Sequence, residues 1–236
     1  MTYEDFLELV KKRRSIRRFK PDPLPDDYVE KIIEAARWSP SGANSQPWEF
    51  VVVKDRDTKE KIGEWFQEAA ELSSRVENTR DSEMRHSSAN SNVARPGFID
   101  APVLILLCGD LRTREVYPLA SMLTRADKIF YSSLASAFLY MHLAATTLGL
   151  ASRWVSSTAN TLPQARIKNL LGIPKEFEIY DTMALGYPAS APRPRFVRER
   201  QGMVHREKFD KSIYRNAQQL REFIIKVHNP NAPAGK

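Results

Sequence analysis

Apolar residues recur along the chain with the spacing of an amphipathic helix from its very start. Tyr3, Phe6, Leu7 and Val10 fall on one helical face. Thr2 precedes this face and can cap the helix, and Asp5 stands at the position from which a side chain can complete a capping box. The pattern therefore predicts a first helix that leads directly into the basic segment KKRRSIRRFK at residues 11–20.

The same patterning predicts five more helices and four strands. One helix opens at Pro25, presents an apolar face from Val29 to Ala36 and stops at Ser39-Pro40. The other helices are expected over 58–75, 125–148 and 161–171, with a fourth near the C-terminus, and buried strands over 49–53, 103–109, 151–156 and 180–185. Helices and short strands alternate irregularly and no repeat is visible, which favours a single α+β domain.

Residues 76–97, VENTRDSEMRHSSANSNVARPG, interrupt this pattern because they are polar and have no apolar periodicity. A stretch of this length in a compact domain is usually either a functional lid or disordered. We expect a lid.

Charge is concentrated in one place. The chain has 36 Lys+Arg and 29 Asp+Glu, and seven of the basic residues lie within 11–20, so the rest carries 29 of each sign. A protein that follows a nucleic-acid backbone usually spreads its cations over a face. The concentration favours a local anion such as a phosphate, although a solvated charge run at the end of a helix remains the alternative.

The remaining composition excludes several classes of site. The single cysteine, Cys108, cannot form an internal disulfide or a multi-cysteine zinc site, which indicates a reducing compartment. No window approaches the roughly 20 apolar residues of a membrane span, and the N-terminus does not resemble a signal peptide. Signatures of P-loop proteins, zinc proteases and serine hydrolases are absent. We expect a cytoplasmic protein without metal, membrane or nucleic acid.

Four segments in order resemble the FMN-dependent nitroreductase superfamily: RRSIRRF, SPSGANSQPWEFVVV, DAPVLILLC and ALGYP. The resemblance covers roughly residues 10–205. It implies a nitroreductase-like fold, with a central mixed or antiparallel sheet flanked by helices, in an intertwined homodimer. It also implies a domain at 1–205, with 76–97 as its lid, and a helical extension at 206–236.

The resemblance implies which anion the basic segment binds. In this family the N-terminal segment holds the phosphate and ribityl chain of FMN, which assigns Arg13, Arg14, Ser15 and Arg17 to the cofactor. The phosphate carries about −1.5 to −2 charges, and arginine binds it bidentately. Arg17 is the candidate for the cation beside flavin N1 and O2, where reduction adds negative charge.

Further cofactor contacts follow from the other matching segments. SPSGANSQPW resembles the loop that packs on the flavin from the partner subunit. It contributes Pro40, Ser41, Gly42 and Asn44. Ser156 and Ser157 stand where the family presents groups to flavin N5. The alternative is two ordinary serines at a strand end. The family also closes a basic pair on the phosphate after ALGYP, for which Arg198 and then Arg200 are the candidates.

The substrate is less determined. Residues 51–62 and the helix that follows resemble the iodotyrosine deiodinase branch, which makes Ala43 and Glu71 candidate substrate contacts. Ser74 stands where that branch has a tyrosine, which argues against iodotyrosine. Glu71 is then a surface residue of its helix.

The resemblance implies an oxidoreductase that moves electrons from NADH or NADPH through FMN to a flat, electron-poor acceptor, such as a nitroaromatic or a quinone. One alternative is a deiodinase-like reductive dehalogenase. Another, of a different class, is a non-catalytic flavin- or nucleic-acid-binding protein.

The C-terminal segment carries an apolar seam. Ile213, Ala217, Leu220, Ile224 and Val227 are spaced as one face of a helix that Ser212 could cap. Because the family builds its flavin site across a dimer, we expect this seam to pack on the partner subunit, the alternative being the helix's own domain.

Overall fold

The computed structural model describes residues 1–86, 95–192 and 195–228. The chain forms two compact units, one of residues 1–69 with 95–192 and one of residues 70–94 with 193–236. The helix α3 (Arg56–Glu77) begins in the first unit and ends in the second. The predicted boundary between 205 and 206 stays a prediction.

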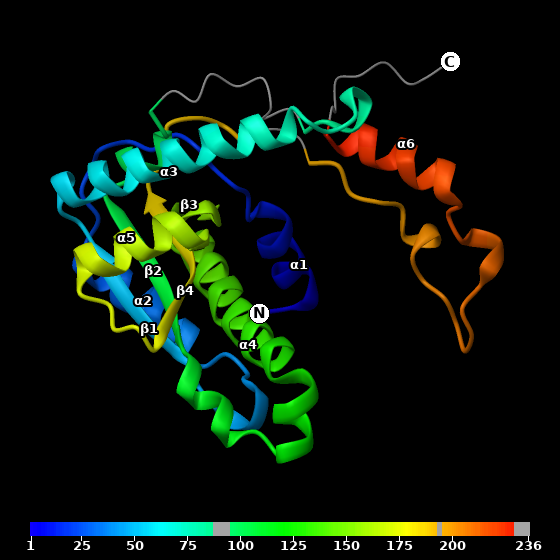
Figure 1. Ribbon diagram of the computed structural model, residues 1–236, viewed down its shortest axis with the longest axis horizontal. Coiled ribbons are helices and arrows are strands. Elements are labelled where there is room, and N and C mark those ends of the chain that lie inside the picture. Colours follow the sequence, from blue (N-terminus) through cyan, green and yellow to red (C-terminus); the bar gives the residue numbers. More distant parts are fainter. Residues whose placement is uncertain (87–94, 193–194, 229–236) are drawn as a thin grey trace. The chain divides into compact units, whose positions relative to one another are not determined.

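The first unit is built on a four-stranded sheet in which every neighbouring pair is antiparallel (Figure 1). The order is β1-β2-β4-β3, with β1 at Trp48–Val53, β2 at Val103–Asp110, β3 at Ala151–Val155 and β4 at Phe177–Gly186. Seven consecutive residues of β2 are buried, as expected for a central strand. The predicted α+β class with a helix-flanked sheet is confirmed, and the sheet is antiparallel.

Helices cover both faces of this sheet. On one face, α2 (Asp26–Arg37) and α4 (Leu119–Thr147) share a core with alternate residues of β2 and β4. On the other, α3 and α5 (Thr161–Leu171) pack through Ile62 and Ile167 against the intervening positions. The first helix, α1 (Tyr3–Lys12), contacts α4.

Local signals place the helix ends as predicted. Both hydrogen bonds of the capping box form at α1: Thr2 Oγ1 accepts from the backbone N–H of Asp5, and Asp5 Oδ2 accepts from that of Thr2. The helix α2 starts directly after Pro25. The helix α5 ends at Gly172, whose φ of 66° is left-handed and suits glycine.

Three predicted elements need correction. The long helix begins at Leu119 rather than residue 125, because the chain passes through a kink at Arg125 (φ −152°) without ending the helix. The β1 strand is only half buried, since it lies at the edge of the sheet. The C-terminal helix α6 spans Ala217–His228 and is capped by Asn216, not by Ser212.

The correction at α6 shortens the predicted seam. Ile213 lies in a separate 3-10 turn, Lys211–Ile213, where Ser212 instead donates to Asp210. Within α6, Leu220 and Val227 are 43% and 48% exposed. The described residues therefore leave these seam positions accessible.

The helix α4 is long and apolar enough to cross a membrane by length and composition, contrary to the expectation that no segment would be. Half of its most apolar stretch is buried in the first unit, which is the situation of a core helix. A buried core helix also meets these criteria of length and composition. The cytoplasmic location stays a prediction.

Candidate functional site

The basic segment leaves α1 and lies along the free edge of β3. Ser15 forms a parallel bridge with Ser152, and the backbone N–H of Ile16 donates to the carbonyl oxygen of Ser152 at 3.1 Å. Ile16 and Phe19 are buried and anchor the segment to the core. These two anchors fix the backbone, while Arg17 and Arg18 between them are exposed and Arg13 and Arg14 before them are half-buried.

Arg17 lies beside a second arginine that sequence reasoning missed. The guanidinium of Arg153 on β3 lies 5.5 Å and 5.9 Å from the ring centroids of Phe98 and Phe66. Burial lowers the pKa of Arg153, and the charge of Arg17 lowers it further. In the described part of the chain neither arginine forms an ion pair with a carboxylate.

Arg17 and Arg153 are two close cations, and Arg153 is largely removed from water. Because Arg153 has no counter-ion among the described residues, the pair creates a positive potential that favours an anion. The backbone at this point is also tightly held. A Cβ on Gly97 would come within 2.8 Å of the carbonyl oxygen of Arg17. Gly97 therefore allows the segment before β2 to pack directly on the basic segment.

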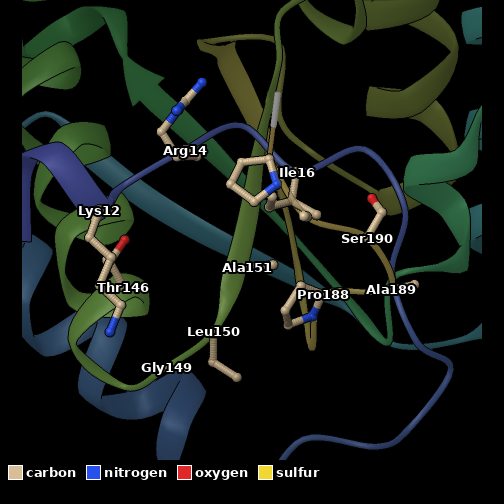
Figure 2. A pocket seen from close by; sticks show the side chains of 12 residues that line it. Lys12, Arg14, Ile16, Thr146, Gly149, Leu150, Ala151, Pro188, Ala189 and Ser190 are labelled. Carbon is tan, nitrogen blue, oxygen red and sulfur yellow. The ribbon is translucent and has the colours of Figure 1, made fainter. Parts of the chain in front are cut away.

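A cavity of about 530 Å³ adjoins the same segment (Figure 2). Lys12 and Arg14 lie on one side of it, and Ser190 comes from the segment after β4. Its remaining lining is mostly apolar and comes from Ile16, from the turn between α4 and β3, and from residues 188, 189, 191 and 192. The cavity therefore combines cations at its rim with an apolar floor.

Arg13 lies close enough to α4 for its charge to act on His142. The charge of Arg13 contributes, after burial, to the lowered pKa of His142 on α4. His142 Nδ1 lies 2.7 Å from Ser152 Oγ. Arg13, Arg14, Ser15 and Arg17 therefore all gather around the start of β3, as a shared site requires.

The loop that carries Pro40, Ser41, Gly42, Ala43 and Asn44 lies elsewhere in the unit. The N–H of Gly42 donates to Ser133 Oγ at 3.1 Å, and a Cβ at this position would lie 2.1 Å from Ile129 Cγ2. Ala43 and Asn44 have left-handed φ values of 52° and 54°. The close packing of the loop on α4 is sufficient to explain why residue 42 is a glycine.

The two halves of the expected site are therefore separated along α4. The loop contacts the helix at Ile129 and Ser133, whereas the basic segment lies near His142. At 1.5 Å per residue, Ile129 and His142 are about 20 Å apart along the helix axis. One chain does not bring the loop to its own basic segment.

Ser156 and Ser157 directly follow β3, and Trp154 of this strand contacts a carboxyl group that sequence reasoning missed. Trp154 Nε1 donates to Asp181 Oδ2 of β4. Burial raises the pKa of Asp181 to about 6, and the hydrogen bond from Trp154 limits the rise. Ser157 begins the 3-10 turn Ser157–Ala159. The signal for Asp181 was available, since it is a carboxylate within the otherwise apolar run that forms β4.

Arg198, Arg200 and Glu71 belong to the second unit. Arg198 Nη2 donates to the carbonyl oxygen of Gly202 at 2.6 Å, and Arg200 begins the exposed 3-10 turn Arg200–Gly202. Glu71 is exposed on α3. Residues 87–94 of the expected lid lie outside the described residues. The roles of these residues stay predictions.

Comparison with known proteins agrees with the architecture. The sequence model of the Nitroreductase family matches residues 10–187. The chain therefore belongs to the nitroreductase family.

Among curated relatives, iodotyrosine deiodinase 1 of Rattus norvegicus is 30% identical over 80% of this chain and 64% of the deiodinase, so the chain spans slightly less than two thirds of that relative. A "Putative NADH dehydrogenase/NAD(P)H nitroreductase" of Methanothermobacter thermautotrophicus is 29% identical over 81% of each chain. Among solved structures, "a putative nitroreductase in complex with FMN" from Desulfovibrio desulfuricans is 25% identical, with a TM-score of 0.62 over 89% of this chain and all of the other.

Proposed function

We propose that the protein is an FMN-dependent oxidoreductase that takes electrons from NADH or NADPH and passes them to a flat, electron-poor aromatic acceptor of the nitroaromatic or quinone type. The observation that carries the proposal is the basic segment held along β3, where Arg17 and Arg153 lack a carboxylate partner among the described residues. The names of the relatives support the cofactor and the electron donor.

The residues present fit FMN. A phosphate needs guanidinium and hydroxyl donors, which Arg13, Arg14 and Ser15 supply around one strand edge. The adjoining cavity gives room beside these cations. Arg17, with Arg153 behind it, would stabilise the negative charge that reduction adds to the pyrimidine edge of the ring. FMN itself supplies the hydride and electron chemistry when bound.

The other residues of the site orient and shield the cofactor. Ser156 and Ser157 would offer hydrogen bonds at the end of β3, beside Trp154, which is 36% exposed. Arg198, with Arg200 as the second candidate, would close on the phosphate. The proposal needs no side-chain nucleophile. Among the described residues no group of three or more His, Cys, Asp and Glu could hold a metal ion.

The site requires a homodimer in this proposal. The loop of Pro40, Ser41, Gly42 and Asn44 contacts α4 at Ile129 and Ser133, which lie about 14 to 20 Å along the helix from His142 near the basic segment. The loop can come from a second copy. The outer face of α4 offers a surface for it, because Leu139 and Tyr140 are 44% and 38% exposed. Exposed Leu220 and Val227 of α6 offer another, as expected for an extension at 206–236 that packs on the partner.

Sedimentation of two variants tests this assembly. Leu139→Asp on α4 should shift dimer towards monomer and release FMN as well, because the partner's loop leaves with the other chain. Leu220→Asp should do the same if α6 reaches the partner. A Leu139→Asp protein that remains dimeric and retains its flavin would contradict the role of α4.

A deiodinase-like reductive dehalogenase is the second candidate, favoured by the identity to iodotyrosine deiodinases. Ala43 and Glu71 would then contact the substrate. Ser74 at the position expected for tyrosine weakens this candidate. A non-catalytic flavin- or nucleic-acid-binding protein is the remaining possibility.

One experiment separates these functions. The purified protein is reduced anaerobically with NADH or with NADPH, and a nitroaromatic, a quinone and an iodotyrosine are then added in parallel while the flavin absorbance is followed. Rapid reoxidation by the nitroaromatic or quinone supports the proposal. Selective reoxidation by iodotyrosine supports the dehalogenase, and a colourless protein, or a flavin that neither nucleotide reduces, would contradict both enzymes.

A further inference from the structure

The second unit has a cavity of its own, at the turns that precede α6. Its volume is about 310 Å³, at the lower end of the range for small-molecule sites. Every lining residue lies between Arg198 and Leu220, so the cavity is formed within this unit. Three side chains of the lining are basic, those of Arg198, His205 and Arg215, and none of the described lining residues is acidic. The cavity therefore has the charge of an anion site.

Arg215 is the cation of this cavity that lacks a partner. Its Nη1 atom is buried and has no hydrogen-bond acceptor among the described residues. It also forms no ion pair with a carboxylate in the part of the chain that the structure describes. Phe223 of α6 holds the guanidinium group, whose carbon lies 4.4 Å from the centroid of the ring. Because a buried donor without an acceptor is costly, an anion bound here would stabilise the unit.

The second arginine of the cavity is already engaged. Arg198 Nη2 donates to the carbonyl oxygen of Gly202 at 2.6 Å. The guanidinium carbon of Arg198 lies 5.9 Å from the centroid of the same Phe223 ring. Arg198 therefore adds positive charge to the cavity, whereas Arg215 has the donor without an acceptor.

His205 has a defined donor of its own. Its Nδ1 accepts the backbone N–H of Asp210 at 3.0 Å, so the proton of the neutral imidazole is on Nε2. The Asp210 carboxylate instead accepts from the backbone N–H and the hydroxyl of Ser212, at 2.8 Å and 2.6 Å. The cavity thus combines a charged donor, Arg215, with a neutral one, Nε2 of His205.

Flat aromatic surface completes the lining. The ring of His205 stacks on Phe209 with a centroid distance of 4.0 Å and an interplanar angle of 21°. Tyr214 meets Phe209 edge-on at 6.2 Å. Phe209 and Tyr214 are 61% and 66% exposed, so their surfaces are open to another aromatic ring. A ligand that matches both features has an anionic group attached to an aromatic ring.

We propose that this cavity binds a small aromatic carboxylate. The carboxylate would accept hydrogen bonds from Arg215, whose planar guanidinium matches its geometry, and from His205. The aromatic ring would lie against Phe209 and Tyr214. The inference is independent of the proposed function, because all four residues lie in the second unit and none is assigned to the cofactor.

Calorimetric titration of the full-length protein, with FMN present, tests the site with three probes. Naphthoate should bind. Naphthamide, which lacks the charge, and cyclohexanecarboxylate, which lacks the flat ring, should each bind about tenfold more weakly or less. Arg215→Gln should weaken naphthoate binding by about tenfold or more. The matched control is Arg206→Gln, which removes one charge from an exposed residue outside the lining and should leave the affinity unchanged.

Four results would overturn the proposal. The first is the absence of naphthoate binding, and the second is equal binding of naphthoate and naphthamide. The third is a loss of affinity in Arg206→Gln as large as in Arg215→Gln, which would indicate general attraction to a positive surface. The fourth is displacement of naphthoate by FMN, which would assign the cavity to the cofactor.

Two further outcomes keep the test decisive. If Arg215→Gln does not fold, Phe209→Ala takes its place, because Phe209 is exposed: unchanged naphthoate binding in this variant would overturn the proposal. A protein that binds naphthoate as expected but holds no flavin would support the cavity and contradict the proposed function.

Discussion

Each end of β3 has a side chain paired with a buried titratable group, in different surroundings. At its start, Ser152 is 2% exposed and bonds to His142, which is 1% exposed. Near its end, Trp154 pairs with Asp181 of β4, which is 7% exposed. Trp154 joins the two pairs, because its ring stacks on His142 at 5.5 Å and its N–H donates to Asp181.

Burial acts on both pairs in the same physical sense. Removal from water disfavours the charged form, so it lowers the pKa of the base His142 to about 3 and raises that of the acid Asp181 to about 6. The difference lies in access. His142 is sealed in the core, whereas Asp181 bonds to Trp154, whose side chain is 36% exposed.

The largest expected effect is the acid sensitivity of the His142 pair. The unfolded chain binds a proton below pH 6.5, whereas folded His142 does so only near pH 3. The free energy of unfolding should therefore fall as pH drops from 6.5 to about 3, by up to about 5 kcal/mol. Urea denaturation at several pH values measures this, and His142→Gln should flatten the profile.

His86→Gln, at an exposed position, is the control for that experiment and should leave the acid profile unchanged. Equal profiles for His142→Gln and wild type would mean that His142 is not held neutral.

The Asp181 pair should show the opposite sign and a smaller size. Because the folded pKa of about 6 lies above the ordinary 3.8, its contribution to stability is fully present below pH 3.8 and is lost as pH rises through 6. The loss amounts to about 3 kcal/mol. In Asp181→Asn the corresponding part of the pH profile should disappear. A variant whose free energy of unfolding follows wild type from pH 4 to 8 would refute this.

Trp154→Phe separates the two pairs and should have the smallest effect. It keeps an aromatic ring beside His142 but removes the N–H that favours ionised Asp181. The pKa of Asp181 should rise by about one unit, since one unit corresponds to about 1.4 kcal/mol. The fall in the free energy of unfolding at acid pH, which is due to His142, should be unchanged. Carboxyl ¹³C NMR measures the first expectation and denaturation below pH 6 the second.

Sequence patterning predicted the architecture well where local signals suffice. The capping box at Thr2, the helix stop at Gly172 and the apolar run of β2 are each local in sequence, and the structure confirms them. The start of α6 was misjudged because Asn216 competes with Ser212 as a cap and only backbone geometry distinguishes them.

The site could be predicted only in part. The basic segment was visible as a charge concentration, and the structure gathers its members at β3. Arg153 and Asp181 were not recognised, because their significance depends on partners elsewhere in the chain: Arg17 beside Arg153, and Trp154 beside Asp181. Such pairings follow from register, which single-sequence periodicity does not determine.

The most direct test of the account is the FMN affinity of Arg13→Ala beside that of Lys11→Ala. Both changes remove one positive charge from the same segment, but Lys11 is an exposed residue of α1 whereas Arg13 is half-buried beside β3. A charge-assisted contact to phosphate contributes roughly 1.5–3 kcal/mol, so Arg13→Ala should weaken FMN binding roughly 10- to 100-fold and Lys11→Ala should leave it nearly unchanged. Equal dissociation constants for wild type and Arg13→Ala, measured by flavin fluorescence at fixed ionic strength, would contradict the assignment of the basic segment to the cofactor.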